Sequence, residues 1–431
     1  MIKKIKSFFS GFQKNKVIRL SVKSLDDFKY FNVAKQLFIH FQNQNENYKP
    51  KLVGGCVRKL ITGEKIDDMD IAINLVPEEV KKILVEKKIK FIETGFAHGT
   101  ITVLIKDFKF EVTSLRKDVS TDGRHAKVEF TSDWEQDAQR RDFTINAIYS
   151  DISGEVYDPL NGVEDLNNGI IKFIGDPNQR IQEDYLRILR YLRFYTQYNK
   201  NKSHDEITVK AIKKNLDGLA KISKERILEE LFKMMKLKNF SKLFEDEFCR
   251  FVILSILPQL HNYSRIKMLN KIPHKIGNQI DKIILLSILI VDETDSCDFF
   301  LYKYQISNED KKRILFIKNS FKNYSKQYLY SKKNLLKLTY LSDKSSVIGL
   351  LIFLIFNNPT KIFKIENLIE YIKNKSIPKF PINANFLKEE FNFLEGKQLG
   401  NALKKLEKQW IDNDFSIDKS NIKSLLNLKK I

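Results

Sequence analysis

The hydrophobic pattern between about residue 50 and residue 175 predicts strands and helices in alternation. Residues 51–54 and 91–94 are each predicted to form a short strand. Residues 100–105 and 108–115 alternate between apolar and polar positions, which is typical of a β-hairpin. Because strands and helices are interleaved here, we expect one domain built on a mixed sheet.

Helix starts are marked in the same part of the chain. Residues 24–42 begin with SLDD, a capping sequence with acidic residues in the first turn, and continue with apolar residues at helical spacing. Pro77 is followed by two glutamates, which suit the positive end of a helix dipole. Residues 133–147 are also expected to be helical, with a short strand at 156–157.

From Asp176 onward the pattern is helical throughout. Residues 176–194 predict one long amphipathic helix that starts at the Asp-Pro pair. Residues 200–431 are rich in Lys, Leu, Ile and Asn and contain few prolines, so we expect an all-α region. Its core helices are expected at 228–237, 283–291 and 346–356, with a break at 373–381.

Charge and cysteine content narrow the function classes. The 431 residues carry a formal charge of +21, which favours a polyanionic partner, and nucleic acid is the first candidate. The alternative is a lysine-rich composition without functional meaning. Three widely spaced cysteines do not suggest a disulfide framework or a zinc site, and they fit a reducing cytosol. With no apolar run of membrane-spanning length and a poor signal peptide, we expect a cytoplasmic protein and no membrane partner.

Residues 52–74, LVGGCVRKLITGEKIDDMDIAIN, hold the densest chemistry. Asp68 and Asp70 flank one residue at the start of an apolar strand, where positions two apart share a face. Two such carboxylates repel each other unless they share a cation, usually Mg²⁺. The backbone N–H groups of Gly54 and Gly55, with the Arg58 guanidinium, could hold a triphosphate. Together these features indicate metal-assisted phosphoryl or nucleotidyl transfer.

Glu111 is a candidate third carboxylate, because an acidic residue within an apolar strand is costly unless it is paired or bound to metal. The alternative is a glutamate at the sheet edge, paired to Arg116 or to a lysine. Arg140 and Arg141 form a second candidate pair: one could reach phosphate while the other pairs with a neighbouring aspartate. Taken alone, such arginines are more often part of surface salt bridges.

Asp184, Arg187, Arg190 and Arg193 follow one another at helical spacing in the segment 176–194. An aspartate accepts hydrogen bonds and an arginine donates them, so this face could read the edge of a nucleobase. The alternative is a helix face held by salt bridges between residues three apart.

Five motifs occur in the order and approximate spacing of those in class II tRNA nucleotidyltransferases. They are GGCVR (54–58), DMD (68–70), DGR (122–124), RRDFTIN (140–146) and EDYLRILR (183–190). The chain therefore resembles the bacterial CCA-adding enzymes and their relatives, the bacterial poly(A) polymerases, within the polymerase-beta-like nucleotidyltransferase superfamily. The resemblance is dense over residues 50–195 and thin afterwards.

The resemblance implies a role for each matching residue, with tRNA, CTP and ATP as partners. Asp68 and Asp70 hold Mg²⁺, Gly55 and Arg58 bind the triphosphate, and one of the two adjacent arginines contacts nucleotide. Asp184 and Arg187 act as a protein template for the base, and Arg190 and Arg193 extend that face. A flexible loop around residues 118–124, with Asp122, Gly123 and Arg124, serves the switch from C to A addition.

Pattern and resemblance together predict an α+β fold, with a polymerase-beta-like nucleotidyltransferase head followed by an all-α neck, body and tail. The expected boundaries are an N-terminal extension with a helix (1–48), the head (49–175), the neck (176–240), the body (241–375) and the tail (376–431).

Some residues depart from the family pattern. Lys59 stands where many members have Asp, and His204, His261 and His274 stand apart instead of forming a phosphohydrolase motif. Residues 95–103, GFAHGTITV, lack the signature associated with poly(A) polymerases, which favours CCA addition. A poly(A) polymerase, a partial CC- or A-adding enzyme and a catalytically silent RNA-binding protein remain as alternatives. The intact Asp68/Asp70 pair argues against the last.

Overall fold

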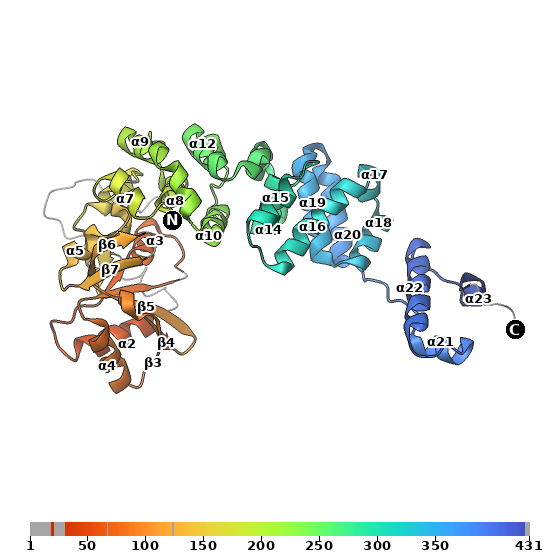
Figure 1. Ribbon diagram of the computed structural model, residues 1–431, viewed down its shortest axis with the longest axis horizontal. Helices are drawn as coiled ribbons and strands as arrows, with labels where there is room; N and C mark the ends of the chain where they lie inside the picture. Colours follow the sequence, from red (N-terminus) through yellow and green to blue (C-terminus); the bar gives the residue numbers. More distant parts are fainter. Residues whose placement is uncertain (1–18, 21–30, 67, 123–124, 427–431) are drawn as a thin grey trace. The chain divides into compact units, whose positions relative to one another are not determined.

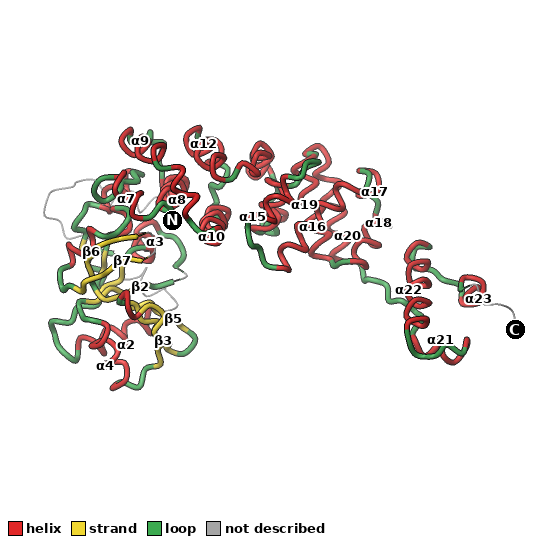
Figure 2. Tube along the Cα trace, in the orientation of Figure 1, coloured by secondary structure: helices red, strands yellow, loops and turns green. Residues whose placement is uncertain are grey.

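The computed structural model describes residues 19–20, 31–66, 68–122 and 125–426, and it divides into two compact units. The first is Met1–Ile256 and the second is Leu257–Ile431. Figure 1 colours both units along the sequence and Figure 2 separates helices from strands. The finer domain boundaries given above stay predictions.

A mixed seven-stranded sheet lies in the described part of the first unit, with strand order β3-β4-β5-β2-β1-β8-β9. Its strands are β1 (Lys51–Val53), β2 (Asp70–Ile73), β3 (Lys90–Gly95), β4 (Thr100–Ile105), β5 (Phe108–Ser114), β8 (Tyr149–Ser150) and β9 (Val156–Tyr157). Strands β2 and β5 pair in parallel, and the other neighbours pair antiparallel. The predicted strands, the hairpin of β4 and β5, and the mixed sheet are therefore confirmed.

The helices beside this sheet begin and end where local signals place them. They are α2 (Phe31–Gln42), α3 (Gly55–Thr62) and α4 (Pro77–Glu86). Pro77 occupies the first turn of α4, as predicted, and α4 packs against β3 and β4. α2 confirms the second part of the helix predicted at 24–42, whose first residues lie outside the described ranges.

The prediction of a helix over residues 133–147 is wrong. Helix α5 (Trp134–Gln139) ends early, Phe143 is extended, and a 3-10 turn, η3 (Thr144–Asn146), follows. The Ile174 N–H donates to the Asp142 carbonyl at 3.1 Å, and the Thr144 N–H donates to the Lys172 carbonyl at 3.1 Å. These tertiary bonds replace helical ones, and so the arginine pair does not lie on a helix.

The prediction of one continuous helix over residues 176–194 is also wrong. Helix α7 (Pro177–Glu183) and helix α8 (Arg187–Tyr198) are separated at Asp184, whose φ of −154° and ψ of 103° are extended. The Asp184 carboxylate accepts from the Leu186 N–H at 3.2 Å and from Arg226 Nη2 at 2.8 Å. Aspartate side chains compete for backbone donors in this way, and here that interrupts the helix.

A polar loop was expected around 118–124, but the described residues on either side of positions 123–124 pair as two antiparallel strands. These strands are β6 (Arg116–Asp122) and β7 (His125–Phe130). Asp122 ends β6, whereas Gly123 and Arg124 lie outside the described residues.

Helices complete the first unit after the sheet. They are α6 (Gly162–Asn168), α9 (Glu206–Lys214), η4 (Leu216–Lys221), α10 (Lys224–Met235), α11 (Lys242–Glu245) and α12 (Glu247–Ile256). Helix α8 packs against α10 and α11 and buries Ile188, Leu189 and Leu192. The core helix predicted at 228–237 is thus confirmed as α10.

The second unit is all-α over its described residues, as predicted. Its elements are η5 (Pro258–Lys271), α13 (His274–Gly277), α14 (Lys282–Ile290), α15 (Ser296–Lys303), α16 (Asn308–Asn323), α17 (Lys326–Leu329), α18 (Lys332–Leu341), α19 (Lys344–Asn357), η6 (Pro359–Lys361), α20 (Ile362–Asn374), α21 (Ala384–Phe391), α22 (Lys397–Asp412), η7 (Lys419–Asn421) and α23 (Ile422–Leu425). The apolar helices α14 and α19 form its core, and the chain is irregular between α20 and α21, where a break was predicted. None of the described helices is both long and apolar enough to cross a membrane.

Candidate active site

A cavity of about 610 Å³ in the first unit gathers most of the predicted site residues. It is bounded by the start of α3, the approach to β2, the segment after α5, one face of α8 and the end of α10. Its lining consists of Gly54, Gly55, Arg58, Lys59, Asp68, Asp70, Arg141, Asp142, Asn146, Arg190, Arg193, Phe194, Gln197, Lys233, Lys236 and Leu237.

The acidic residues meet where β2 begins. Asp70 is its first residue and pairs in register with Glu111 on the parallel strand β5. Asp68 lies just before the first residue of the strand and not on it, and both aspartates line the cavity. Burial, reinforced by the carboxylates of Asp68 and Glu111, raises the pKa of Asp70 to about 6. Such crowding of oxygen ligands is the donor chemistry that a hard divalent cation relieves, so the residues fit one.

Glu111 does not have the partners of the alternative interpretation. Arg116 instead pairs with Asp118, Nε to Oδ1 at 3.8 Å, and donates to the His98 carbonyl. Within the described ranges Glu111 makes no ion pair with a lysine either. It lies beside the cavity and contributes negative charge at Asp70 without lining the wall itself.

The glycine pair gives backbone access to the cavity. Gly54 has a φ of 67°, a conformation that L side chains rarely adopt, and a Cβ there would lie 3.4 Å from the Asn146 carbonyl oxygen. Gly55 starts α3, and a Cβ there would meet nothing within 4 Å. The first N–H groups of a helix have no intrahelical acceptor, so this turn offers donors to an anion.

Arg58 lies in the wall of the cavity and is only 6% exposed, and several contacts hold its guanidinium in place. Its Nε donates to the Tyr198 hydroxyl at 3.0 Å, and its Nη1 donates to the Asn146 side-chain oxygen. The guanidinium carbon stands 4.7 Å from the centre of the Phe194 ring. An ordered, positively charged group therefore borders the acidic cluster.

Buried Asp137 binds both adjacent arginines. Its Oδ1 lies 2.7 Å from Arg140 Nη2, and its Oδ2 lies 3.0 Å from Arg141 Nη2 and accepts from the Tyr149 hydroxyl at 2.7 Å. Burial opposes ionisation of Asp137, but the two guanidinium groups outweigh it and lower its pKa to about 2. Of the two arginines, only Arg141 lines the cavity.

Two arginines of α8 line the same cavity, and each is paired with a buried carboxylate. Asp142 accepts from Arg190 Nε at 2.7 Å and from the Asn146 amide at 2.8 Å. Burial opposes ionisation of Asp142, yet Arg190 and Asn146 hold its pKa below the ordinary range. Arg193 Nε lies 2.8 Å from Glu230 on α10.

The structure does not bring Asp184 and Arg187 into this cavity. Asp184 is bonded to Arg226, and Arg187 Nη1 contacts both the Arg180 carbonyl at 2.6 Å and Glu183 at 2.5 Å. The helix break at Asp184 separates that residue from α8, and Arg187, the first residue of α8, is held by Glu183 and the Arg180 carbonyl. Arg190 and Arg193 face the cavity and the first two residues do not.

Several lining residues were missed by the sequence reasoning. Gln197 could have been found, since it follows Arg193 by one helical turn. Lys233 and Lys236 come from α10 and its end, and nothing in their local sequence sets them apart from other lysines. Lys59 was noted only as a departure, yet its Nζ lies 3.5 Å from Asp68 Oδ1.

Comparison with known proteins finds two matching domain families and relatives along most of the chain. Residues 51–172 match the poly A polymerase head domain family, and residues 205–263 match a family described as the probable RNA and SrmB-binding site of polymerase A. The human mitochondrial CCA tRNA nucleotidyltransferase 1 is 33% identical over 396 residues, covering 88% of this chain and 87% of that protein.

A bacterial relative and a solved structure extend the match to nearly the whole chain. The CCA-adding enzyme of Ligilactobacillus salivarius is 32% identical, covering 94% of this chain and 98% of that protein. The CCA-adding enzyme of Bacillus stearothermophilus, solved with CTP, superimposes with a TM-score of 0.68 at 22% identity, covering 93% and 97% of the two chains. On the strength of these near-full-length matches, this chain belongs to the CCA tRNA nucleotidyltransferase family.

Proposed function

We propose that this chain adds the CCA sequence to the 3′ ends of tRNA, with CTP and ATP as substrates and without a nucleic-acid template. The observation that carries this proposal is the single cavity that joins an acidic cluster to a set of phosphate-binding donors. Nucleotidyl transfer needs both, because the reaction develops negative charge on a triphosphate beside an attacking hydroxyl. The near-full-length relatives are named for this activity.

The triphosphate is proposed to lie along the start of α3. The Gly55 backbone N–H and the guanidinium groups of Arg58 and Arg141 would bind its oxygens, whereas the Gly54 N–H already donates to the Ile148 carbonyl at 3.1 Å. Arg58 is already oriented by Tyr198, and Arg141 by Asp137, so binding would cost little side-chain entropy. Arg141 is our choice over Arg140 because it lines the cavity.

Asp68 and Asp70 are proposed to hold Mg²⁺, with Glu111 adding charge beside Asp70. The ion, when bound, lowers the pKa of the attacking hydroxyl and offsets charge on the phosphate. The RNA 3′-hydroxyl would release its proton to solvent, and its oxygen would bond to the α-phosphorus as the bond to pyrophosphate breaks. Arg58 would stabilise the charge that collects on the departing pyrophosphate.

Base selection is proposed for Asp184 and Arg187, with Arg190 and Arg193 nearer the cavity. Asp184 would exchange its bond to Arg226 for a base donor, and Arg187 would exchange Glu183 for a base acceptor. Residues 118–124, including Asp122, Gly123 and Arg124, are proposed to assist the change from C to A. The cytosol is the proposed compartment, because all three cysteines are free and buried.

The deciding experiment extends a tRNA transcript that lacks its 3′ CCA, with Mg²⁺ and with CTP, ATP or both. Product lengths read at single-nucleotide resolution should show two C additions, then one A, then a stop. Addition of CC alone or A alone would replace the proposal with a partial enzyme, and a long A tail with a poly(A) polymerase. No extension of a bound tRNA would indicate a silent RNA-binding protein.

A further inference from the structure

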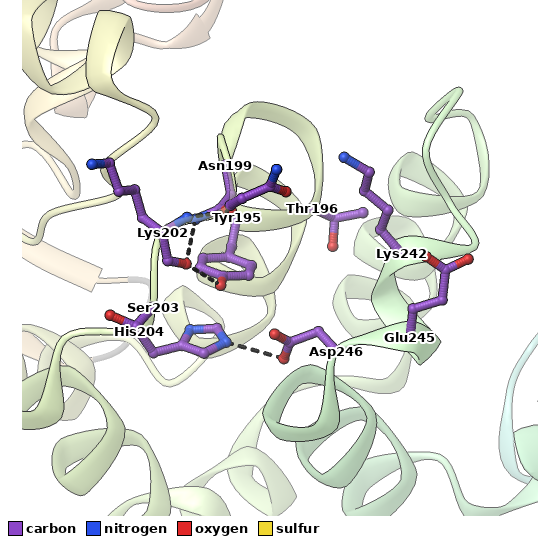
Figure 3. A pocket seen from close by; sticks show the side chains of 10 residues that line it. Tyr195, Thr196, Asn199, Lys202, Ser203, His204, Lys242, Glu245 and Asp246 are labelled. Carbon is purple, nitrogen blue, oxygen red and sulfur yellow. Dashed lines mark hydrogen bonds and ion pairs between the residues drawn. The ribbon is translucent and has the colours of Figure 1, made fainter.

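A second cluster of chemically active side chains lies behind the active-site helix. Arg190, Arg193 and Gln197 of α8 line the cavity described above, whereas Tyr195 of the same helix and Asn199, which follows its last residue, line a different cavity of about 520 Å³. His204 and Asp246 line this second cavity, and Figure 3 shows them directed toward each other.

The cluster consists of His204, Asp246 and Cys249, whose ligand atoms all lie within 4.8 Å of one another. His204 Nε2 is 3.0 Å from Asp246 Oδ1, and the Cys249 backbone N–H donates to the same oxygen at 2.7 Å. Imidazole, carboxylate and thiol are the three side-chain types that bind zinc and related ions. The three residues are separated by up to 45 positions in the chain, so their spacing gave no sign of a metal site.

The imidazole is oriented as in metal sites, where the second ring nitrogen is held by a hydrogen-bonding partner. The Tyr191 hydroxyl lies 2.8 Å from His204 Nδ1. The Tyr195 ring stacks on the imidazole with centroids 3.8 Å apart and planes 18° apart. These contacts fix the ring so that Nε2 is directed at the carboxylate.

A buried hydroxyl in the same cavity has no partner. Thr196 is 4% exposed, and its Oγ1 makes no hydrogen bond within the described part of the chain. It lines the cavity that His204 and Asp246 border, and Figure 3 shows its position on α8. Buried polar atoms without a partner are rare and call for an unseen water or ion. A cavity of this size has room for a water that bonds to Thr196 and completes a coordination shell.

Without metal, two hydrogen bonds to Asp246 hold the cluster together. The Asp246 carboxylate accepts from the Cys249 backbone N–H, and from His204 when the imidazole proton is on Nε2. Burial raises the pKa of Cys249 well above its usual range, so the thiol is protonated near neutral pH. Burial opposes ionisation of Asp246 as well, but the His204 hydrogen bond outweighs it and lowers the pKa of Asp246 to about 2.

We propose that His204, Asp246 and Cys249 bind one zinc-type divalent ion, with a water from the cavity as a fourth ligand. On binding, the Cys249 thiol releases one proton to solvent and its sulfur bonds to the ion. The imidazole proton moves from Nε2 to Nδ1 by exchange with water. The Nδ1–H then donates a hydrogen bond to the Tyr191 hydroxyl. No oxidation or group transfer is involved.

Thiolate and imidazole favour a zinc-type ion over Mg²⁺, which prefers oxygen ligands. The site is therefore distinct in chemistry from the carboxylates Asp68 and Asp70. It would fasten the segment before α9 to the first turn of α12, because His204 precedes α9 and Cys249 lies in α12. The bound ion acts as a structural clasp for this part of the first unit.

Cobalt is a suitable probe, because Co²⁺ replaces zinc and its bond to thiolate gives an intense near-ultraviolet absorption. The full chain is stripped with a chelator, kept reduced with a non-chelating phosphine, and titrated with Co²⁺ in excess Mg²⁺. We expect one equivalent to produce the thiolate band, and Zn²⁺ to abolish it. The Cys249→Ser and His204→Gln variants should lose the band.

The chain offers two matched controls, since Cys56 and Cys297 are also buried and free. Cys297→Ser should keep the band, and Cys56→Ser should keep it too, although Cys56 Sγ contacts the Asp70 carbonyl beside the active site. Tyr191→Phe tests the orientation of the imidazole and should weaken Co²⁺ binding by about 10-fold or more.

Circular dichroism checks that each variant is folded. At low ion concentration, Zn²⁺ should raise the unfolding temperature of the wild-type chain but not that of the folded Tyr191→Phe or His204→Gln variants. A wild-type chain without a thiolate band, or a band that persists in Cys249→Ser, would overturn the proposal. Loss of CCA addition would not, because the two sites share no residue.

Discussion

Asp70 and Glu111 stand directly opposite each other on the parallel strands β2 and β5. This pairing sets two carboxylates side by side at the edge of a cavity that also contains Asp68. Their mutual repulsion, added to burial, keeps the pKa of Asp70 near 6 instead of near 4. The local sequence around Asp70 or Glu111 does not predict that these two residues are neighbours.

Replacement of Asp70 by Asn should reduce nucleotide incorporation by about 1000-fold or more, because it removes a ligand at the point of phosphate attack. Binding of tRNA should change little. Incorporation is measured under single-turnover conditions and binding by filter retention. Asp107→Asn, in the exposed turn between β4 and β5, is the matched control. Full activity in Asp70→Asn would contradict the metal assignment.

Stability of the metal-free chain should depend on Asp70 and pH. Its pKa is about 6 in the folded state and near 3.8 for an unperturbed aspartate, so the folded state binds more protons than the unfolded chain between these values. Ionised Asp70 therefore lowers the free energy of unfolding. This loss is absent below about pH 4 and complete above about pH 6, where it reaches up to about 3 kcal/mol.

Asp70→Asn should therefore unfold at a higher temperature than wild type at pH 7.5 in chelator, and the difference should close at pH 4. Thermal melts of the two proteins at both pH values measure this. Saturating Mg²⁺ should narrow the gap at pH 7.5, because a bound cation offsets the repulsion. Equal melting temperatures at pH 7.5 in chelator would show that Asp70 is not destabilising.

Arg140 and Arg141 provide a matched pair of tests, because both are bonded to Asp137 and only Arg141 lines the cavity. Arg141→Gln should lower kcat/KM for CTP and ATP by about 100-fold, whereas Arg140→Gln should lower it far less. Steady-state kinetics with both nucleotides give the comparison, and melting curves check that the two variants lose similar stability. Equal kinetic losses would remove the distinction between the two arginines.

Base choice should depend on residues at the helix break. The double variant Asp184→Ala, Arg187→Ala should relax or abolish the preference for C and then A, because its side chains are the proposed base partners. Divalent-ion binding should survive, since Asp68 and Asp70 are untouched. Misincorporation of each nucleotide on tRNA ending in no C, one C and two Cs is measured. Unchanged selection would move base recognition to Arg190 and Arg193, which already line the cavity.

Gly54 and Gly55 should respond differently to alanine. Gly54→Ala is expected to destabilise the first unit by about 1–3 kcal/mol, because a side chain is strained at a φ of 67°. Gly55→Ala should leave stability nearly unchanged, since its Cβ would point into open space. Denaturant unfolding of both variants tests this, and equal destabilisation would show that backbone conformation at Gly54 is not the limiting factor.

Much of the fold follows from local sequence. The alternation at residues 100–105 and 108–115 is sufficient for a hairpin, and Pro77 with its glutamates marks a helix start. The apolar segments of α14 and α19 likewise identify core helices. Periodicity and capping act within a few residues, so they can be read directly from the chain.

The errors arose where long-range bonds override those local signals. Asp142 and Thr144 exchange helical hydrogen bonds for bonds to the segment around Phe173, and Asp184 turns to Arg226 and interrupts a helix that periodicity favours. In each case the partner is distant in the chain.

The sequence by itself determined the types of side chain needed for nucleotidyl transfer, their order, and the family that the order resembles. Only the tertiary structure decided that Glu111 faces Asp70, that Arg141 and not Arg140 lines the cavity, and that Lys233 joins it from α10. It also brought His204 to Cys249 across 45 positions. The physical reason is the same throughout: local propensity sets each element, whereas strand pairing and helix packing decide which distant side chains meet.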